Sequence, residues 1–235
     1  MNNKIDIGKS LSQGWAGFKN NAGTAILIVL IYFLLELVIS YVPYLDIIYG
    51  LFIAPVLTGG LYIFSLKAAR NEETSTKDLF EGFKRFATYL GLFWMYFLIM
   101  VVIAVPFMVL LFLEMAYPAY PLDTAITVAA VLTILVIIYA MIRISMAYFL
   151  VIDGMNVTDA IKKSIAVTKS NEMQILVLFV IYVVLILLGI LALVIGVFAA
   201  LPFTTIAFAA AYIQLMNYGK SELSHEAGES EGFGA

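Results

Sequence analysis

The sequence predicts an all-α, polytopic membrane protein with six transmembrane helices, organised as three repeats of an interfacial helix followed by a membrane hairpin. Three observations lead to this fold class: the apolar composition, six apolar segments of sufficient length, and cations confined to alternate connections. Of 235 residues, 63% are hydrophobic and 12% are charged, whereas soluble domains have about 45–50% apolar and about 25% charged residues. Lipid is therefore the expected solvent for most of the chain.

Six segments are apolar over the roughly 20 residues that a helix needs to cross a bilayer. Arg143 follows the fourth, and the apolar run then resumes as far as Ile152. The run 173–216 would be about 66 Å long as one helix, so we expect it to fold back near residues 193–198, around Gly196. The predicted spans are 22–42, 47–66, 91–113, 125–142 and the two halves of 173–216.

The cations lie before span one, between spans two and three, between spans four and five, and after span six. The connections after spans one, three and five have neither Lys nor Arg, and acids such as Asp46, Glu114 and Asp123 lie in the first two of them. Because cytoplasmic connections are enriched in Lys and Arg, this asymmetry places both termini in the cytoplasm, in a prokaryotic cytoplasmic membrane. Arg143 is the one cation outside the pattern.

The chain is predicted to be one transmembrane domain, residues 1–220, with repeat units of about 7–70, 78–152 and 158–218. Three amphipathic segments on the cytoplasmic side precede the hairpins, at residues 10–21, 78–89 and 160–171, with Gly14, Gly82 and Ser164 in register. Such helices are expected to lie in the interface plane, with apolar residues in the acyl region and cations among phosphates.

Small residues recur every four positions in the even-numbered spans, and such stripes let helix backbones approach closely in lipid. The three triplets are Gly50, Ala54 and Thr58; Ala125, Ala129 and Thr133; and Gly196, Ala200 and Thr204. Residues 221–235 are rich in Gly, Ser and Glu and are predicted to form a disordered tail.

Glu36 and Arg143 form the candidate intramembrane polar site. A carboxyl group at the depth of Glu36 faces protein or water as a proton or cation site, or else marks the end of the first span at the outer interface. Counting along the repeat places Arg143 opposite Ala68, at the cytoplasmic end and far from Glu36. The sequence therefore favours a guanidinium that snorkels to lipid phosphates over a Glu36–Arg143 ion pair.

Prolines and basic pairs complete the candidate residues. Pro55, Pro106 and Pro202 lie inside spans and are expected to kink them, either as hinges or as bends tolerated for packing. The basic pairs serve as contacts for anionic lipid head groups on the cytoplasmic side, or only as the topology signal. These pairs are Lys84 with Arg85 and Lys162 with Lys163.

The sequence lacks the residues and motifs that several kinds of catalytic or binding site require. It has no cysteine and one histidine, His225, and no phosphate-binding loop, nucleophile elbow or zinc-helix motif. We therefore predict no metal, no cofactor, no enzyme site and no nucleic-acid partner.

Four segments carry a resemblance to a known family: SLSQGWAGFKNN at residues 10–21, GGLYIFSLKAARNEE at 59–73, KDLFEGFKRF at 77–86 and DAIKKSIAVTKSN at 159–171. In this order they resemble prokaryotic six-span proteins, namely the membrane domain of membrane-anchored glycerophosphodiester phosphodiesterases and its stand-alone relatives of unknown function. In the fused enzymes the chemistry belongs to a separate soluble domain, so no catalytic residue carries over. The resemblance implies a membrane module that supports a partner or handles lipid.

Three functions remain open on the sequence. The first is a non-enzymatic membrane module that anchors, assembles or regulates a protein partner or a second copy of the chain. The second is a transporter or scramblase of lipids or small amphiphiles, suggested by the basic interfacial segments, the prolines and Glu36. The third, an enzyme acting on lipid within the membrane, needs converging polar groups that Glu36 alone does not supply.

Overall fold

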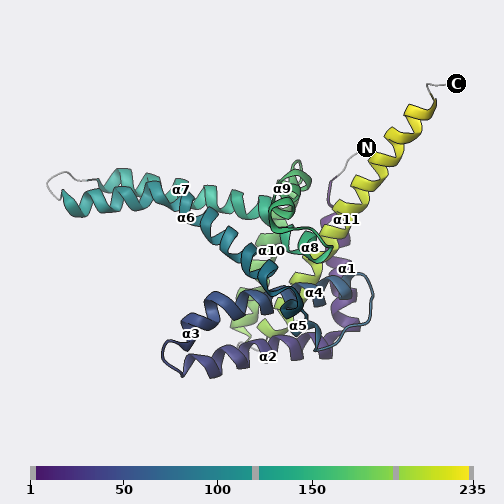
Figure 1. The fold of residues 1–235 in the computed structure, drawn as a ribbon, viewed down its shortest axis with the longest axis horizontal. Coiled ribbons are helices and arrows are strands. Elements are labelled where there is room, and N and C mark those ends of the chain that lie inside the picture. The colour runs from purple at the N-terminus through teal and green to yellow at the C-terminus, as the bar shows by residue number, and fades with distance from the viewer. Residues whose placement is uncertain (1–3, 118–121, 193–195, 233–235) are drawn as a thin grey trace.

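The computed structural model describes residues 4–117, 122–192 and 196–232, with side chains up to residue 217, and these residues form helices and their connections (Figure 1). Six stretches are long and apolar enough to cross a membrane, as predicted. They are Ala22–Ser40, Leu45–Ala69, Asp78–Ala116, Asp123–Ile152, Glu172–Leu191 and Val197–Asn217. The protein is therefore a multi-pass membrane protein.

The elements follow one another as amphipathic helices and hairpins. The first part of the chain contains α1 (Ile7–Asn20), α2 (Ala22–Ser40), α3 (Leu45–Ile48), the π-helix η1 (Tyr49–Ile53) and α4 (Ala54–Ala69). The middle part contains α5 (Asp78–Glu81), the 3-10 helix η2 (Gly82–Arg85), α6 (Phe86–Ala116), α7 (Asp123–Ile144) and α8 (Ala147–Ile152). The last part contains α9 (Val157–Thr168), α10 (Glu172–Leu191) and α11 (Val197–Gly232).

Local signals explain where two of the amphipathic helices begin. The Asp6 carboxylate accepts a hydrogen bond from the Lys9 N–H and caps α1, and the Asn156 side chain caps α9 by accepting from the Asp159 N–H. Both are residue types favoured at this position, because their oxygens satisfy an otherwise unpaired N–H. The fifth span ends at Leu191 and the sixth begins at Val197, which agrees with the predicted reversal.

The amphipathic helix α1 packs on protein through its small residues. A Cβ added to Gly14 would lie 2.7 Å from the Cβ of Ala207 in α11, and one added to Gly17 would lie 3.0 Å from the carbonyl oxygen of Ala68. Trp15, beside Gly14, is 56% exposed. The small side of α1 therefore faces α11, and its large apolar residue faces outward.

The short pair α5–η2 approaches α4 still more closely. A Cβ on Gly60 would lie 1.9 Å from the carbonyl oxygen of Leu79, and a Cβ on Gly82 would lie 2.1 Å from that of Val56. Gly50 meets nothing within 4 Å, so in this span the close contact falls at Gly60 and not at the Gly50 end of the predicted stripe. The reason is that the α5–η2 backbone crosses α4 at Val56 and Gly60.

The helix α9 packs on the junction of α7 and α8 through Ser164. The Ser164 hydroxyl donates to the carbonyl oxygen of Arg143 over 2.8 Å and accepts from the Met146 N–H over 3.2 Å. These bonds satisfy backbone groups at the break between the two helices, where unpaired groups would be costly in a buried setting.

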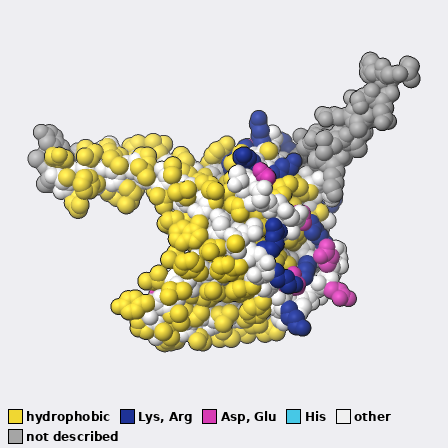
Figure 2. All heavy atoms as spheres, viewed as in Figure 1, with side chains coloured by type: hydrophobic (Ala, Val, Ile, Leu, Met, Phe, Trp, Pro, Cys, Tyr) yellow, Lys and Arg dark blue, Asp and Glu magenta, His cyan; other side chains and the backbone are white. Residues whose placement is uncertain are grey.

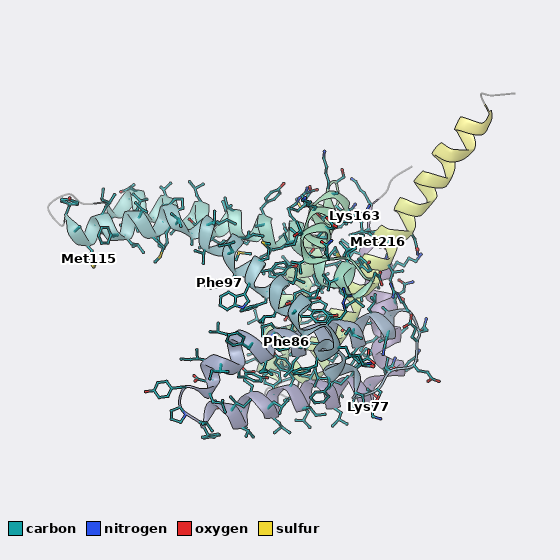
Figure 3. The ribbon with its side chains drawn as sticks, viewed as in Figure 1. Lys77, Phe86, Phe97, Met115, Lys163 and Met216 are labelled. Atoms are coloured by element: carbon teal, nitrogen blue, oxygen red, sulfur yellow. The ribbon has the colours of Figure 1, made fainter. Side chains whose placement is uncertain are left out.

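Two parts of the molecule differ in how they are covered. Figure 1 shows α6 and α7 extending together away from the other helices, and Figure 3 places Met115 near the far end. We call described residues 97–117 and 122–137 the arm, and the other described residues the body. No side chain of the arm is buried. The core belongs to the body, where Phe64, Tyr89 and Phe149 are almost fully enclosed.

The C-terminal segment differs from its prediction. The backbone of α11 continues as a helix to Gly232, where the sequence predicts a disordered tail over residues 221–235. Glu, Ala and Lys are good helix formers, and extending an existing helix avoids the cost of nucleation. The side chains beyond residue 217 and the structure of residues 233–235 lie outside the description.

Candidate functional site

A cleft of about 340 Å³ lies where the arm joins the body. Residues of α4, α6, α7, α8, α10 and α11 line it: Tyr62, Tyr96, Met100, Ile138, Met141, Ile142, Ile144, Ser145, Tyr148, Phe149, Ile175, Phe179, Tyr182, Thr205 and Phe208. Figure 2 shows a hollow between the arm and the hydrophobic surface of the body, on the side away from most of the charged residues. The cleft thus belongs to the apolar part of the molecule.

Stacked tyrosines build one wall of the cleft. The rings of Tyr62 and Tyr148 are stacked with centroids 4.7 Å apart, and Tyr96 meets Tyr148 edge to face at 5.8 Å. The Tyr96 hydroxyl donates to the carbonyl oxygen of Ile144 over 2.6 Å. Aromatic pairs in these geometries contribute about 0.5–1.5 kcal/mol beyond their buried area, so this wall is fixed by packing.

The two aliphatic hydroxyls at the cleft already have partners. Ser145 donates to the carbonyl oxygen of Ile142 over 2.8 Å, and Thr205 accepts from the Ser65 hydroxyl over 2.8 Å. Neither partner is a His, Lys or carboxylate that could activate the hydroxyl as a nucleophile. The cleft is therefore suited to hold apolar matter.

Arg143 forms an ion pair that sequence reasoning missed. Its Nη1 donates to the Glu172 carboxylate over 2.6 Å, and its guanidinium lies 5.9 Å from the centre of the Tyr139 ring. The Arg143 side chain is 12% exposed, and the predicted contact of its guanidinium with lipid phosphates stays a prediction. The connection through α9 brings Glu172, 29 residues further along, to the end of α7.

Glu36 is not brought together with Arg143. It lies near the end of α2, on an exposed part of that helix. None of the ion pairs among the described residues involves it. Both interpretations of Glu36, the end of the span at the outer interface and a proton or cation site, stay predictions.

The charged residues gather along one side of the molecule, on the body (Figure 2). Lys67 donates to Asp78 over 2.6 Å, linking α4 to α5. Arg70 pairs with Asp153 over 2.8 Å, and the Tyr212 hydroxyl donates to the same carboxylate over 2.5 Å. The group Arg70–Asp153–Tyr212 therefore joins the C-terminal ends of α4 and α8 to the middle of α11, with one helix from each hairpin. No sequence motif marks it.

The predicted head-group cations have different surroundings. Lys84, Lys162 and Lys163 are exposed, and Figure 3 shows Lys163 at the edge of the body. Arg85 instead donates to the carbonyl oxygens of Val151 and Met155. Its guanidinium therefore holds the end of α8. Lys84 pairs with Glu81 over 3.4 Å, and Lys162 and Lys163 remain available to a head group.

The three prolines lie in different helical settings. Pro55 is in the first turn of α4, directly after the π-helix η1, whereas Pro106 and Pro202 lie inside α6 and α11. Because η1 continues directly into α4, Pro55, like the two interior prolines, lacks its N–H within a continuous helical stretch. Kinks at Pro106 and Pro202 stay predictions.

The described residues contain no cluster of three or more His, Cys, Asp or Glu side chains that could hold a metal ion. Comparison of the chain with family models, curated proteins and solved structures finds no match.

Proposed function

We propose that this chain is a non-enzymatic membrane module that holds a partner membrane protein against its arm, and that the partner contributes an apolar transmembrane helix. The observation that carries this proposal is the burial of the spans. None of the most apolar 18-residue stretch of Asp78–Ala116 is buried, whereas 61% of the corresponding stretch of Val197–Asn217 is buried. The chain thus builds a well-packed body and leaves one hairpin uncovered.

Helices in lipid associate through close packing, since lipid tails are as apolar as leucine side chains. The arm offers two antiparallel apolar helices that pack on each other and extend away from the other helices (Figure 1). A partner helix can contact the arm without displacing any contact of the body. The uncharged, exposed surface of Val102, Val105 and Phe112 suits such a partner.

Charge placement supports the proposed orientation. The cations of the described side chains lie on the body and none lies on the arm, as Figure 2 illustrates. Since Lys and Arg favour the cytoplasmic side, we place the charged side and both termini in the cytoplasm of a prokaryotic cell. In this orientation Lys84, Lys162 and Lys163 lie among anionic head groups.

The proposal includes a threefold repeat, and the helix contacts support it. In each proposed unit the amphipathic helix packs its small residue on an even-numbered span: Gly14 on α11, Gly82 on α4 and Ser164 on α7–α8. The next residue in each case is large, apolar and at least 40% exposed: Trp15, Phe83 and Ile165. Each amphipathic helix thus contacts the hairpin before its own, and α1 contacts the last one, as in a closed ring.

These contacts also give a register for the proposed repeat. Gly14 meets Ala207, Gly82 meets Val56 and Gly60, and Ser164 meets Arg143 and Met146. The contacts agree to within one residue when three tyrosines are aligned: Tyr62, Tyr148 and Tyr212. In that register Arg143 is opposite Leu57 and lies deeper in its helix than the register with Ala68 indicates.

Site-specific cross-linking tests the partner, because the chain has no cysteine of its own. Val102→Cys on the arm and Val38→Cys on α2 provide a matched pair, with 63% and 65% exposure. In native membranes, a photoactivatable thiol reagent at Val102→Cys should give a discrete adduct with peptides from another protein's transmembrane segment. Adding Val105→Trp should abolish it, and Val38→Cys should not form it.

Several outcomes contradict the proposal. They are the same adducts from both positions, no protein adduct from the arm, or an adduct that survives Val105→Trp. An adduct containing only this chain would show that a second copy occupies the arm and would replace the heterologous partner.

A lipid or small-amphiphile transporter is the second candidate, and the cleft is the observation that favours it. Transport needs a path across the membrane, so the protein reconstituted into vesicles with a fluorescent lipid in both leaflets should expose the inner label to a membrane-impermeant quencher. A rate equal to that of protein-free vesicles would remove this candidate.

A further inference from the structure

The cleft between arm and body has the features of a ligand site that is separate from the outer surface of the arm. We propose that it binds one hydrocarbon chain of a phospholipid, whose phosphate is held by Arg143 at the charged end of the cleft. This inference does not depend on the partner proposed for the arm.

The size and lining of the cleft indicate the class of ligand. Sites for small molecules have volumes of about 300–1,000 Å³ with mostly apolar walls, and this cleft of about 340 Å³ lies at the lower end of that range. Apolar cavities stay free of water but accept apolar guests. Most of the lining is aromatic or aliphatic, and the hydroxyls of Ser145 and Thr205 are bonded within the protein, so a hydrocarbon fits the cleft best.

The dimensions of the cleft favour a single hydrocarbon chain over a transmembrane helix as its ligand. A helix with its side chains is about 10–12 Å wide and takes about 30 Å to cross the bilayer, which is far more than the cleft holds. A single acyl or isoprenoid chain is narrow and flexible. Met141 is 43% exposed and also lines the cleft, so the cleft is reached from the lipid side.

The charged end of the cleft supplies a site for a head group. Glu172 lies one turn before Ile175 on α10, on the helical face that carries Ile175, Phe179 and Tyr182 into the cleft. Its carboxylate pairs with Arg143, so the guanidinium stands where the apolar lining ends.

Arg143 has donors beyond the one used by Glu172. A guanidinium carries five N–H donors and binds phosphate in a forked geometry, and Glu172 is the acceptor that the described structure gives it. Glu172 is 34% exposed and can turn to water when a phosphate arrives. The charge of Arg143 and the hydrocarbon cleft together match a phospholipid.

Native mass spectrometry of the full-length protein in mild detergent tests the proposal, with dioleoylphosphatidylglycerol and dioleoylglycerol as probes. We expect one phosphatidylglycerol per chain at low concentration. Ser145→Phe, which fills the cleft, should abolish binding of both probes. Arg143→Gln should weaken phosphatidylglycerol about tenfold, which corresponds to about 1.4 kcal/mol, and should leave dioleoylglycerol unchanged.

Two controls keep the test decisive. Val102→Phe adds the same side chain to the exposed arm and should bind like the wild type. Met141→Trp fills the cleft from an exposed position, so it serves if Ser145→Phe fails to fold, as judged by thermal unfolding. Equal lipid binding by the wild type and a folded cleft-filling variant, or equal weakening of both probes by Arg143→Gln, would overturn the proposal.

Discussion

The body and the arm differ in how closely their helices pack and in how many of their side chains are buried. In the body, helices approach so closely that Gly60 and Gly82 leave no room for a methyl group, and hydroxyls such as Ser164 satisfy backbone groups of neighbouring helices. In the arm, two helices pack on each other and no side chain is buried. The difference teaches that hydropathy alone does not report which spans form a core.

The largest contrast is expected between two phenylalanines. Phe64 is fully buried in the body, and Phe112 is 62% exposed on the arm. Phe64→Ala should lower the free energy of unfolding by about 3–5 kcal/mol, because it leaves a cavity, and Phe112→Ala should change it by less than about 0.5 kcal/mol. Equilibrium unfolding in mixed micelles measures both, and equal losses would break the comparison.

A pair of glycines gives the next largest effect. Gly60→Ala forces a Cβ against the Leu79 backbone and should destabilise the protein by about 1–3 kcal/mol or more. Gly23→Ala, where nothing lies within 4 Å, should be neutral or stabilising by up to about 1 kcal/mol, since alanine favours the helix. The same unfolding assay applies, and a tolerated Gly60→Ala would show that α5 does not press on α4.

The group Arg70–Asp153–Tyr212 predicts a smaller effect. Tyr212→Phe removes a hydrogen bond to a carboxylate that is 33% exposed, so we expect a loss of about 1 kcal/mol. Tyr41→Phe is the control, because Tyr41 is 79% exposed. Indistinguishable unfolding of the two variants would mean that this junction of three hairpins adds no stability.

The smallest energetic effect is expected at the proline of the arm. Pro106→Ala should straighten α6 while changing the unfolding of the body by less than about 0.5 kcal/mol. Spin labels on Val38→Cys and Phe112→Cys report the distance between α2 and the arm by pulsed electron paramagnetic resonance. An unchanged distance would assign no bend to Pro106, and a large loss of stability would show that arm and body are coupled.

The sequence alone predicts those features that depend on the order of apolar and polar residues along the chain. The six spans, the reversal between Leu191 and Val197, and the amphipathic helices before each hairpin follow from hydropathy and spacing. Hydropathy does not say which face of a span meets another helix. For this reason the small-residue stripe of α4 pointed to Gly50, whereas the backbone contact lies at Gly60.

The cleft and the ion pair beside it depend on contacts between residues far apart in sequence. Tyr62 and Tyr148 belong to different hairpins, and nothing in the local sequence of either tyrosine predicts their stacking. The sequence marks Arg143 as an unusual cation. It does not identify Glu172 as the partner, because the two residues meet only when α9 folds back between α7 and α10. The tyrosine shared by the even-numbered spans was the available signal, and aligning it would have placed Arg143 deeper in the fold.

The uncovered arm also bears on how such a chain diverges over generations. Replacing one oily side chain with another on that surface disturbs no core contact, so drift there proceeds without a penalty in foldedness. A lineage can therefore change the apolar surface of the arm while the packing of the body stays intact. Gly60 and Gly82, at the crossing of α4 with α5–η2, cannot be replaced in this way because a Cβ there would clash with backbone.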